Sequence, residues 1–351
     1  MLISNKGKNK KNIFIDTMEK AFIKDIAYYL PEKVLTNEEI SAQFPEWSAE
    51  KVANKVGITE RHIAAPDETA TDMAYQAAER LFAQGVDKSC IDFVLLCTQS
   101  GDYFLPSSAC LLQDRLGLSK NCGALDFNLG CSGYEYGLAL SKGLIAAGIA
   151  KNILLLTAET YTKYIHPKDK GNRTIFGDGA SASLISTEGF AEIGEVVLGT
   201  DGSGAENLIV RSLSARHKEL YRDERVDEDG NVLSSDHLYM HGGNVFDFTA
   251  DVVPPMVEEL LAKSGLQQDD VDLWIFHQAN KYMINYLRKL LDIDKDKFYL
   301  FMEHVGNTVS STIPIAMVEA RKEGRLHGNV LLAGFGVGLS WGGVMLKIVE
   351  G

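Results

Sequence analysis

The sequence predicts an α/β protein in which buried strands alternate with helices along the chain. Short apolar runs bounded by turn residues have the length and composition of strands buried in a parallel sheet. Between them lie longer segments whose apolar residues recur at helical spacing. In the first half the expected strands cover 91–97, 123–128 and 152–157, and the expected helices cover 71–84, 107–116 and 131–147.

The second half repeats this alternation. Its expected helices cover 252–264, 281–291 and 313–323, and its expected strands cover 273–277, 329–333 and 344–349. The helix expected from residue 131 is rich in small residues, namely Gly137, Ala139, Gly143, Ala146 and Ala147. Because small side chains let neighbouring elements approach closely, this helix is expected to be buried between two halves of the molecule.

Length, composition and charge are those of a soluble, cytoplasmic enzyme. The 351 residues, 45% of them apolar, can form one large or two ordinary domains. No apolar run reaches the roughly 20 residues of a membrane span, and residues 1–20 are expected to be a flexible leader. Five cysteines without disulfide-framework or zinc spacing predict a reducing compartment and no metal. A net charge of -13 argues against nucleic-acid binding.

Cys131 is the best candidate nucleophile. It lies between Gly130 and Gly133, where an expected strand turns into an expected helix. Glycines on both sides allow a sharp turn and the close approach of a substrate. A following helix N-terminus favours the thiolate, which is the reactive form of cysteine. A small buried core thiol is the structural alternative.

Three segments of the C-terminal half provide candidates for the other groups that such a nucleophile needs, a proton carrier and oxyanion donors. In the first, an apolar strand ends on His277 and a polar cluster. In the second, Gly306 and Asn307 form a turn that leads into small hydroxyl residues. The third is the glycine-rich turn 334–343. Each segment alone has an ordinary structural explanation as a turn or a strand end.

The order and spacing of five motifs are more specific. They are Asn128-Leu-Gly-Cys-Ser-Gly133, Phe176-Gly-Asp-Gly-Ala180, His277-Gln-Ala-Asn280, Gly306-Asn-Thr308 and Gly334-Phe-Gly-Val-Gly338. From about Ala21 to Gly351 the chain resembles the 3-oxoacyl-[acyl-carrier-protein] synthase III family of the thiolase-like superfamily. The resemblance implies a thiolase-like duplicated αβαβα layered fold. Its N-terminal half, 21–187, would carry the nucleophile, and its C-terminal half, 188–351, the histidine and asparagine, with the boundary near 186–189.

The resemblance assigns a role to each motif residue. Cys131 would carry the acyl group, and His277 and Asn307 would hydrogen-bond the thioester carbonyl of a malonyl-type substrate. This would stabilise the enolate that forms when carbon dioxide leaves, and the enolate would attack the acyl group to give a 3-oxoacyl thioester. The oxyanion at the acyl-cysteine would be held by the Cys131 N–H and the turn Gly336-Val337-Gly338. Coenzyme A or acyl-carrier-protein thioesters would be substrates, and no cofactor is expected.

The distribution of cysteines favours decarboxylation. All five lie at or before Cys131, whereas biosynthetic thiolases need a second cysteine in the C-terminal half as a base. The elongating synthases use two histidines, and this chain has Asn307 at the third catalytic position. His304, three residues earlier, is either a turn histidine or a functional one. Two other functions stay open: an acyltransferase of the same fold that acts without decarboxylation, and a non-catalytic partner subunit.

Several positions depart from the family's fatty-acid-initiating members. Lys51 and Lys170 stand where a tryptophan and an arginine would sandwich the coenzyme A adenine, and lysine lacks the planar guanidinium. Leu105 stands where an aromatic from the partner chain would close the acyl pocket. These departures predict a primer other than acetyl-coenzyme A. Gly242 and Asn280 are the remaining expected substrate-binding residues.

Two kinds of protein partner are expected. An acidic acyl carrier protein would need a basic patch, which Lys281, Arg288 and Lys289 could form on the helix after His277. A solvated helix face is the alternative reading of these charges. A homodimer is expected because the family's acyl pocket is completed across a two-fold axis, the commonest oligomer symmetry.

Overall fold

The computed structural model describes residues 19–227, 230 and 232–349. All but Glu19 and Lys20 of the predicted leader lies outside these residues, so the leader stays a prediction. No helix in these described ranges combines the length and hydropathy that a membrane crossing requires.

One large mixed sheet organises the molecule. Within the described residues it has nine strands in the order β13-β14-β15-β8-β1-β7-β6-β4-β5. Those before residue 187 are β1 (Phe22–Tyr29), β4 (Phe93–Cys97), β5 (Gly123–Phe127), β6 (Asn152–Glu159) and β7 (Gly179–Ser186). Those after it are β8 (Ala191–Thr200), β13 (Leu273–Phe276), β14 (Asn329–Gly336) and β15 (Ser340–Ile348).

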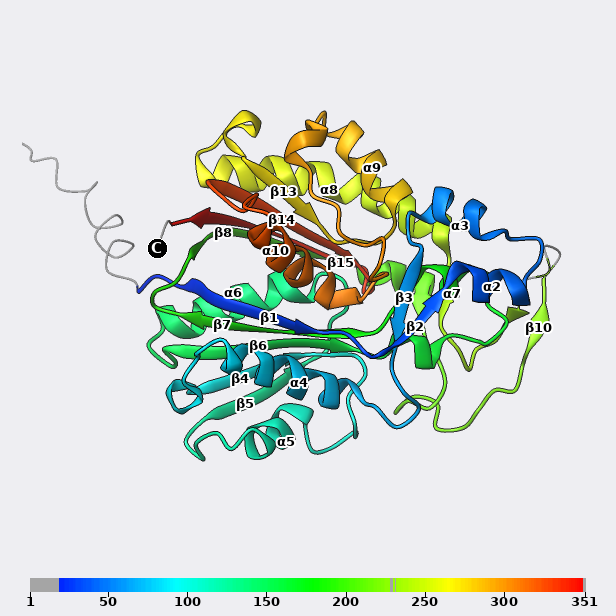
Figure 1. Cartoon of the computed structure of the whole chain (residues 1–351), viewed down its shortest axis with the longest axis horizontal. Helices are drawn as coiled ribbons and strands as arrows, with labels where there is room; N and C mark the ends of the chain where they lie inside the picture. The colour runs from blue at the N-terminus through cyan, green and yellow to red at the C-terminus, as the bar shows by residue number, and fades with distance from the viewer. Residues whose placement is uncertain (1–18, 228–229, 231, 350–351) are drawn as a thin grey trace, which may run out of the picture.

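Helices cover both outer faces of this sheet and separate its two parts (Figure 1). On one outer face, α8 (Gly242–Ser264) contacts β8, β14 and β15, and α9 (Lys281–Leu290) packs on α8. On the other, α4 (Ala70–Ala83) and α5 (Ser108–Arg115) cover the N-terminal strands. Between the parts lie α6 (Gly133–Ala146), which contacts strands of both, and α10 (Thr312–Lys322). This is the predicted thiolase-like αβαβα layering.

Smaller elements line the end of the sheet where the candidate residues gather. They are β2 (Lys33–Thr36), α2 (Asn37–Gln43), α3 (Ala49–Val56), β3 (Glu60–Ile63), α7 (Lys170–Ile175), β9 (Leu208–Ile209), β10 (Arg225–Val226), β11 (Val232–Leu233) and β12 (Tyr239–Met240). The 3-10 helices are η1 (Lys88–Cys90), η2 (Tyr161–Tyr164), η3 (Gly202–Asn207), η4 (Gln268–Asp270), η5 (Lys295–Lys297) and η6 (Val309–Ser311).

The strand order supports the proposed division into halves 21–187 and 188–351. The N-terminal strands lie in the order β5-β4-β6-β7-β1, and the C-terminal ones in the order β13-β14-β15-β8. An isolated parallel bridge between Trp274 and Phe298 stands beside β13, where the first half has β5. With that bridge counted as a strand, the two halves have the same order. The predicted boundary at 186–189 falls between β7 and β8.

One predicted helix was wrong at its start. Helix α8 begins at Gly242 rather than at residue 252, and Pro254 and Pro255 lie inside it. Two prolines and two adjacent glycines normally argue against a helix. Burial of Val245, Phe248 and Thr249 on one face, which continues to Val253 and Met256, outweighs that local preference.

The fold brings the ends of several strands to one edge of the molecule. Strands β13 and β14 are parallel neighbours, and the His277 N–H donates to the Ala333 carbonyl at 2.8 Å. His277 and Gly336 therefore leave adjacent strands on the same side. Cys131 follows β5 and precedes α6, which packs against β14 and β15. Asn307 reaches the same edge through an isolated parallel bridge with Phe176.

Candidate active site

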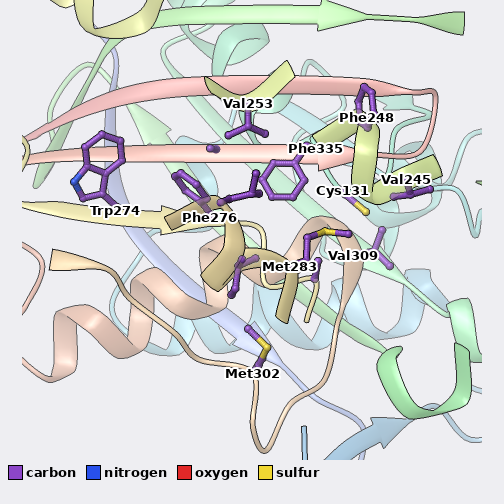
Figure 2. Close-up of a cluster of buried hydrophobic side chains, with 14 of the residues drawn as sticks. Cys131, Val245, Phe248, Val253, Trp274, Phe276, Met283, Met302, Val309 and Phe335 are labelled. Carbon is purple, nitrogen blue, oxygen red and sulfur yellow. The ribbon is translucent and has the colours of Figure 1, made fainter. Parts of the chain in front are cut away.

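An apolar cavity of about 540 Å³ opens at Cys131. Its lining includes Cys131, Asn307 and Gly336, and the expected substrate-binding residues Gly242 and Asn280 also face it. Figure 2 shows Cys131 at one end of a buried cluster, with Val245, Val309 and Phe335 around it. A cavity that is largely apolar and ends at a thiol suits a long, weakly polar arm of a thioester substrate.

The Cys131 thiol is neutral in the free protein. Its side chain is 6% exposed, and burial raises the pKa of the thiol to about 12, opposed by backbone N–H groups at Val337 and Cys131. Desolvation thus opposes the thiolate that the start of helix α6 at Gly133 was expected to favour. The thiol must lose its proton as a substrate binds.

The predicted glycine-rich turn 334–343 is shorter than expected, because β14 runs to Gly336 and β15 begins at Ser340. The end of β14 lies against the thiol. A Cβ on Gly336 would lie 2.7 Å from the Cys131 Sγ, closer than real carbon and sulfur atoms come. Only glycine therefore lets this backbone reach the nucleophile. The Val337 N–H already points at Cys131, and its hydrogen bond opposes the rise in the thiol pKa. The N–H groups of Cys131 and Val337 thus contact the thiol, and their role as oxyanion donors stays a prediction.

His277 and Asn307 form a buried pair beside this cavity. The Asn307 Nδ2 lies 3.5 Å from the His277 Nε2 and 3.4 Å from the Ala279 carbonyl oxygen. Burial lowers the pKa of His277 to about 3, so the imidazole is neutral at physiological pH. Gly306, at φ +80° and packed against Arg61, provides the left-handed turn that positions Asn307. The pair can donate to a substrate oxygen but is a poor base.

The predicted adenine-binding positions are occupied by other contacts. The Lys170 Nζ forms an ion pair with the Glu46 Oε1 at 2.6 Å. The ammonium groups of Lys51 and Lys55 lie 5.9 Å and 5.5 Å from the centre of the Trp47 ring. Neither Lys51 nor Lys170, the two predicted adenine-binding residues, offers a flat surface on which a nucleobase could stack. Lys55 also lines the cavity, a position that was not predicted.

The predicted docking residues lie on α9, but they are not equivalent. Lys281 and Lys289 are exposed, whereas Arg288 is partly buried and donates to the Ile293 carbonyl at 2.7 Å. Exposed Tyr282 and Tyr286 lie beside the lysines and pack on Phe246, with ring centres 5.7 Å and 4.7 Å from it. Their helical spacing was a signal that could have identified this aromatic cluster.

Three further polar residues, Asn280, His304 and Thr312, lie near the cavity or the His277–Asn307 pair. Asn280 caps α9, because its Oδ1 accepts from the Met283 N–H at 2.9 Å. His304 is exposed and its Nδ1 lies 3.3 Å from the Glu60 Oε1, so it is a surface histidine apart from the cavity. Thr312, which contacts His277, was missed, although the hydroxyl-rich run 308–312 was visible. Among the described residues no group of histidine, cysteine and acidic side chains is arranged to hold a metal ion.

This combination of a layered, duplicated α/β fold with a buried cysteine, histidine and asparagine at one edge defines a thiolase-like acyl-condensing enzyme. Two family models match the chain: 3-oxoacyl-[acyl-carrier-protein (ACP)] synthase III over residues 125–202, and the C-terminal region of the same synthase over residues 261–348.

Whole-chain comparisons agree with these matches. A beta-ketoacyl-[acyl-carrier-protein] synthase III of Clostridium perfringens is 36% identical over 335 residues, which cover 94% of this chain and 100% of the relative. A crystal structure of a 3-oxoacyl-(acyl-carrier-protein) synthase III has a TM-score of 0.91 and 50% identity, covering 94% of this chain and 100% of that one. The enzyme from Burkholderia xenovorans LB400 has a TM-score of 0.86 and 32% identity, covering 94% and 95%. The chain therefore belongs to the 3-oxoacyl-[acyl-carrier-protein] synthase III family, whose members are acyltransferases that form 3-oxoacyl thioesters.

Proposed function

We propose that Cys131 takes an acyl group from a thioester and that a malonyl-type thioester then discharges it by decarboxylative condensation. In the first step the Cys131 sulfur attacks the donor carbonyl, and its proton leaves with the donor's thiol. The N–H groups of Cys131 and the turn Gly336-Val337-Gly338 stabilise the oxyanion that forms on the way. The observation that carries this proposal is that Cys131, Asn307 and Gly336 line one cavity, with His277 beside Asn307.

The second step uses the neutral pair. Carbon dioxide leaves the malonyl group, and its bonding electrons pass into an enolate whose oxygen accepts from His277 and Asn307. The enolate carbon attacks the acyl carbonyl, the carbon–sulfur bond breaks, and the Cys131 thiolate takes up a proton. Nothing in this step requires a side chain to remove a proton from carbon. That suits His277, whose pKa of about 3 makes it a weak base.

The low pKa of His277 also argues against the alternative function of acyl transfer without decarboxylation. Acyl transfer to an amine or alcohol requires a general base with a pKa near the working pH to take the acceptor's proton. Buried, neutral His277 is badly matched to that task. A non-catalytic subunit has no need of a nucleophile at the end of a formed cavity. Decarboxylative condensation is therefore the function that the site supports best.

The primer proposed here is a longer or carrier-bound acyl group rather than acetyl-coenzyme A. The Lys170–Glu46 ion pair and the lysines over Trp47 leave the nucleotide without a stacking partner at the family's positions. Stacking contacts contribute roughly 0.5 to 2 kcal/mol each, and each 1.4 kcal/mol is about tenfold in affinity. Loss of two such contacts would weaken acetyl-coenzyme A binding by about one to two orders of magnitude.

We expect a longer or carrier-bound acyl donor to acylate Cys131 about tenfold faster than acetyl-coenzyme A does, or more. Both donors would be used at low micromolar concentration. Rates would be measured by intact-protein mass spectrometry. Lys289→Glu on α9 should slow only the carrier-bound donor, because it places a negative charge against an acidic carrier. Lys88→Glu, the same charge change at an exposed site in η1, is the control. If acetyl-coenzyme A is the fastest donor, the enzyme is an ordinary initiator.

We propose that a two-fold dimer completes the pocket that holds the acyl group. Strand β5 is a sheet edge, and Leu125 on it is 48% exposed. The loop before α5 exposes Phe104 to 86% and Leu105 to 82%. Exposed apolar side chains next to the free edge of a strand are typical of an interface. A second copy seated there would bring its Leu105 loop toward this chain's larger, 840 Å³ hollow, which Phe104 and Tyr161 line.

Light scattering at micromolar concentration should therefore give the mass of a dimer. Leu125→Arg should shift the protein toward the monomer and reduce condensation, because it puts a charge into the proposed interface. Leu220→Arg, at another exposed leucine outside the sheet, should do neither. A wild-type monomer with full activity would remove this part of the proposal.

A further inference from the structure

Thr312 links the two candidate catalytic side chains. It is the first residue of α10, is buried, and places its Oγ1 2.7 Å from the His277 Nδ1. The same oxygen lies 3.1 Å from the Val309 carbonyl oxygen. The Val309 N–H in turn donates to the Asn307 Oδ1 at 2.9 Å. The contacts therefore run from His277 through Thr312 and Val309 to Asn307, and the Asn307 Nδ2 faces His277 again.

The hydroxyl of Thr312 has one proton and two possible acceptors. The Val309 carbonyl already accepts the backbone N–H of Thr312. The His277 Nδ1 is closer to the hydroxyl, at 2.7 Å against 3.1 Å. In a neutral imidazole only one nitrogen carries a proton, and the partner of one nitrogen decides which.

We infer that the Thr312 hydroxyl donates to the His277 Nδ1 and so fixes the imidazole proton on Nε2, the nitrogen next to Asn307. Thr312 is then a positioning residue that acts through His277. The competing arrangement has the proton on Nδ1 and donates it to the Val309 carbonyl, a backbone contact that opposes the lowering of the His277 pKa by burial. It leaves a lone pair on Nε2. The two arrangements make opposite predictions for the chemistry, because only the first presents an N–H donor.

Asn307 is oriented to match. Because its Oδ1 accepts from the Val309 N–H, its Nδ2 must point toward His277. To make this contact, Val309 adopts a positive φ of 58°, which is an uncommon conformation for a β-branched residue. Such a strained conformation persists only where the surrounding contacts hold it in place. Two N–H donors 3.5 Å apart make a poor hydrogen bond with each other. In this arrangement both can donate to a single substrate oxygen.

This inference rests on the proposed function, since it explains how the pair comes to donate to the malonyl thioester oxygen. Removal of the hydroxyl in Thr312→Val should let the proton move to Nδ1 and bond to Val309. The enolate oxygen then loses one donor, and a lost donor of this kind costs on the order of 10²-fold in rate. Acylation of Cys131 should stay within about threefold of wild type, because it uses backbone donors elsewhere.

A matched control exists four residues earlier. Thr308 is also buried in this turn, but its hydroxyl has no hydrogen-bond partner. Thr308→Val should therefore leave both half-reactions and the melting temperature nearly unchanged. Thr312→Ser keeps the hydroxyl and should restore carbon dioxide release to within about threefold of wild type. If Thr312 acted through packing alone, Thr312→Ser, which loses the methyl group, would release carbon dioxide more slowly than Thr312→Val.

The decisive readout is the protonation of His277, measured by ¹⁵N NMR of histidine-labelled protein. The proton is expected on Nε2 in wild type and Thr312→Ser, and on Nδ1 in Thr312→Val. A wild-type imidazole protonated on Nδ1 overturns the inference, and that test does not depend on any variant folding. If the proton moves as expected in Thr312→Val while carbon dioxide release is unchanged, the proposed role of His277 is contradicted instead.

Discussion

Replacement of Cys131 by serine is expected to abolish the acyl adduct. A serine hydroxyl is a far weaker nucleophile than a thiol, and no base is at hand to activate it, because burial keeps His277 neutral with a pKa of about 3. Removing a covalent nucleophile in other enzymes costs on the order of 10⁴ to 10⁶-fold. Intact-protein mass spectrometry after incubation with acyl-thioesters should show no added mass on the variant.

Cys97 provides the control for this experiment. It is another fully buried thiol, and its Sγ lies 3.1 Å from the Leu129 carbonyl oxygen, but it does not line the cavity. Cys97→Ser should still acquire the acyl group. An adduct that persists on Cys131→Ser and vanishes on Cys97→Ser would place the nucleophile elsewhere.

The second large effect is expected for His277→Ala and Asn307→Ala. Both variants should still acylate Cys131, because the oxyanion of that step is held by backbone N–H groups. Each should slow carbon dioxide release from a malonyl thioester by about 10² to 10³-fold, the typical cost of one lost oxyanion donor. Trapped carbon dioxide and the adduct mass would be measured on the same samples.

The surface histidine makes a suitable comparison. His304→Ala, at an exposed position paired with Glu60, should leave both half-reactions intact. Loss of acylation in both His277→Ala and Asn307→Ala would sink the proposed division of labour between the cysteine and the neutral pair.

The sequence was sufficient to predict the layered fold, and it singled out three side chains, Cys131, His277 and Asn307, whose catalytic roles stay predictions. Apolar runs identified β4, β6, β13 and β14, because each is largely buried and bounded by turn residues. They also identified the edge strand β5, whose residues are only partly buried or exposed. The sequence was not sufficient for the extent of α8, where Gly242 and two prolines oppose a helix that packing nevertheless supports. Local preference cannot report such tertiary contacts.

The protonation states of the site residues could not be predicted from the sequence either, because they depend on tertiary contacts. A glycine-flanked cysteine before a helix suggested a thiolate, yet burial raises the pKa of Cys131. Part of that burial comes from the backbone at Gly336, about two hundred residues away in sequence. Thr312 was missed because its contact with His277 joins residues 35 apart in sequence. The Glu46–Lys170 ion pair likewise depends on the packing of α7 against the loop before α3, which the sequence does not show.

The central claim, that the acyl group on Cys131 is discharged by decarboxylative condensation, can be tested in one sequential experiment. The enzyme is acylated, freed of donor, and mixed with a malonyl thioester while adduct mass and carbon dioxide are followed together. We predict that the adduct disappears as one carbon dioxide is released and one 3-oxoacyl thioester forms per site. An adduct that survives the malonyl thioester but is discharged by an amine or alcohol without carbon dioxide would contradict this account.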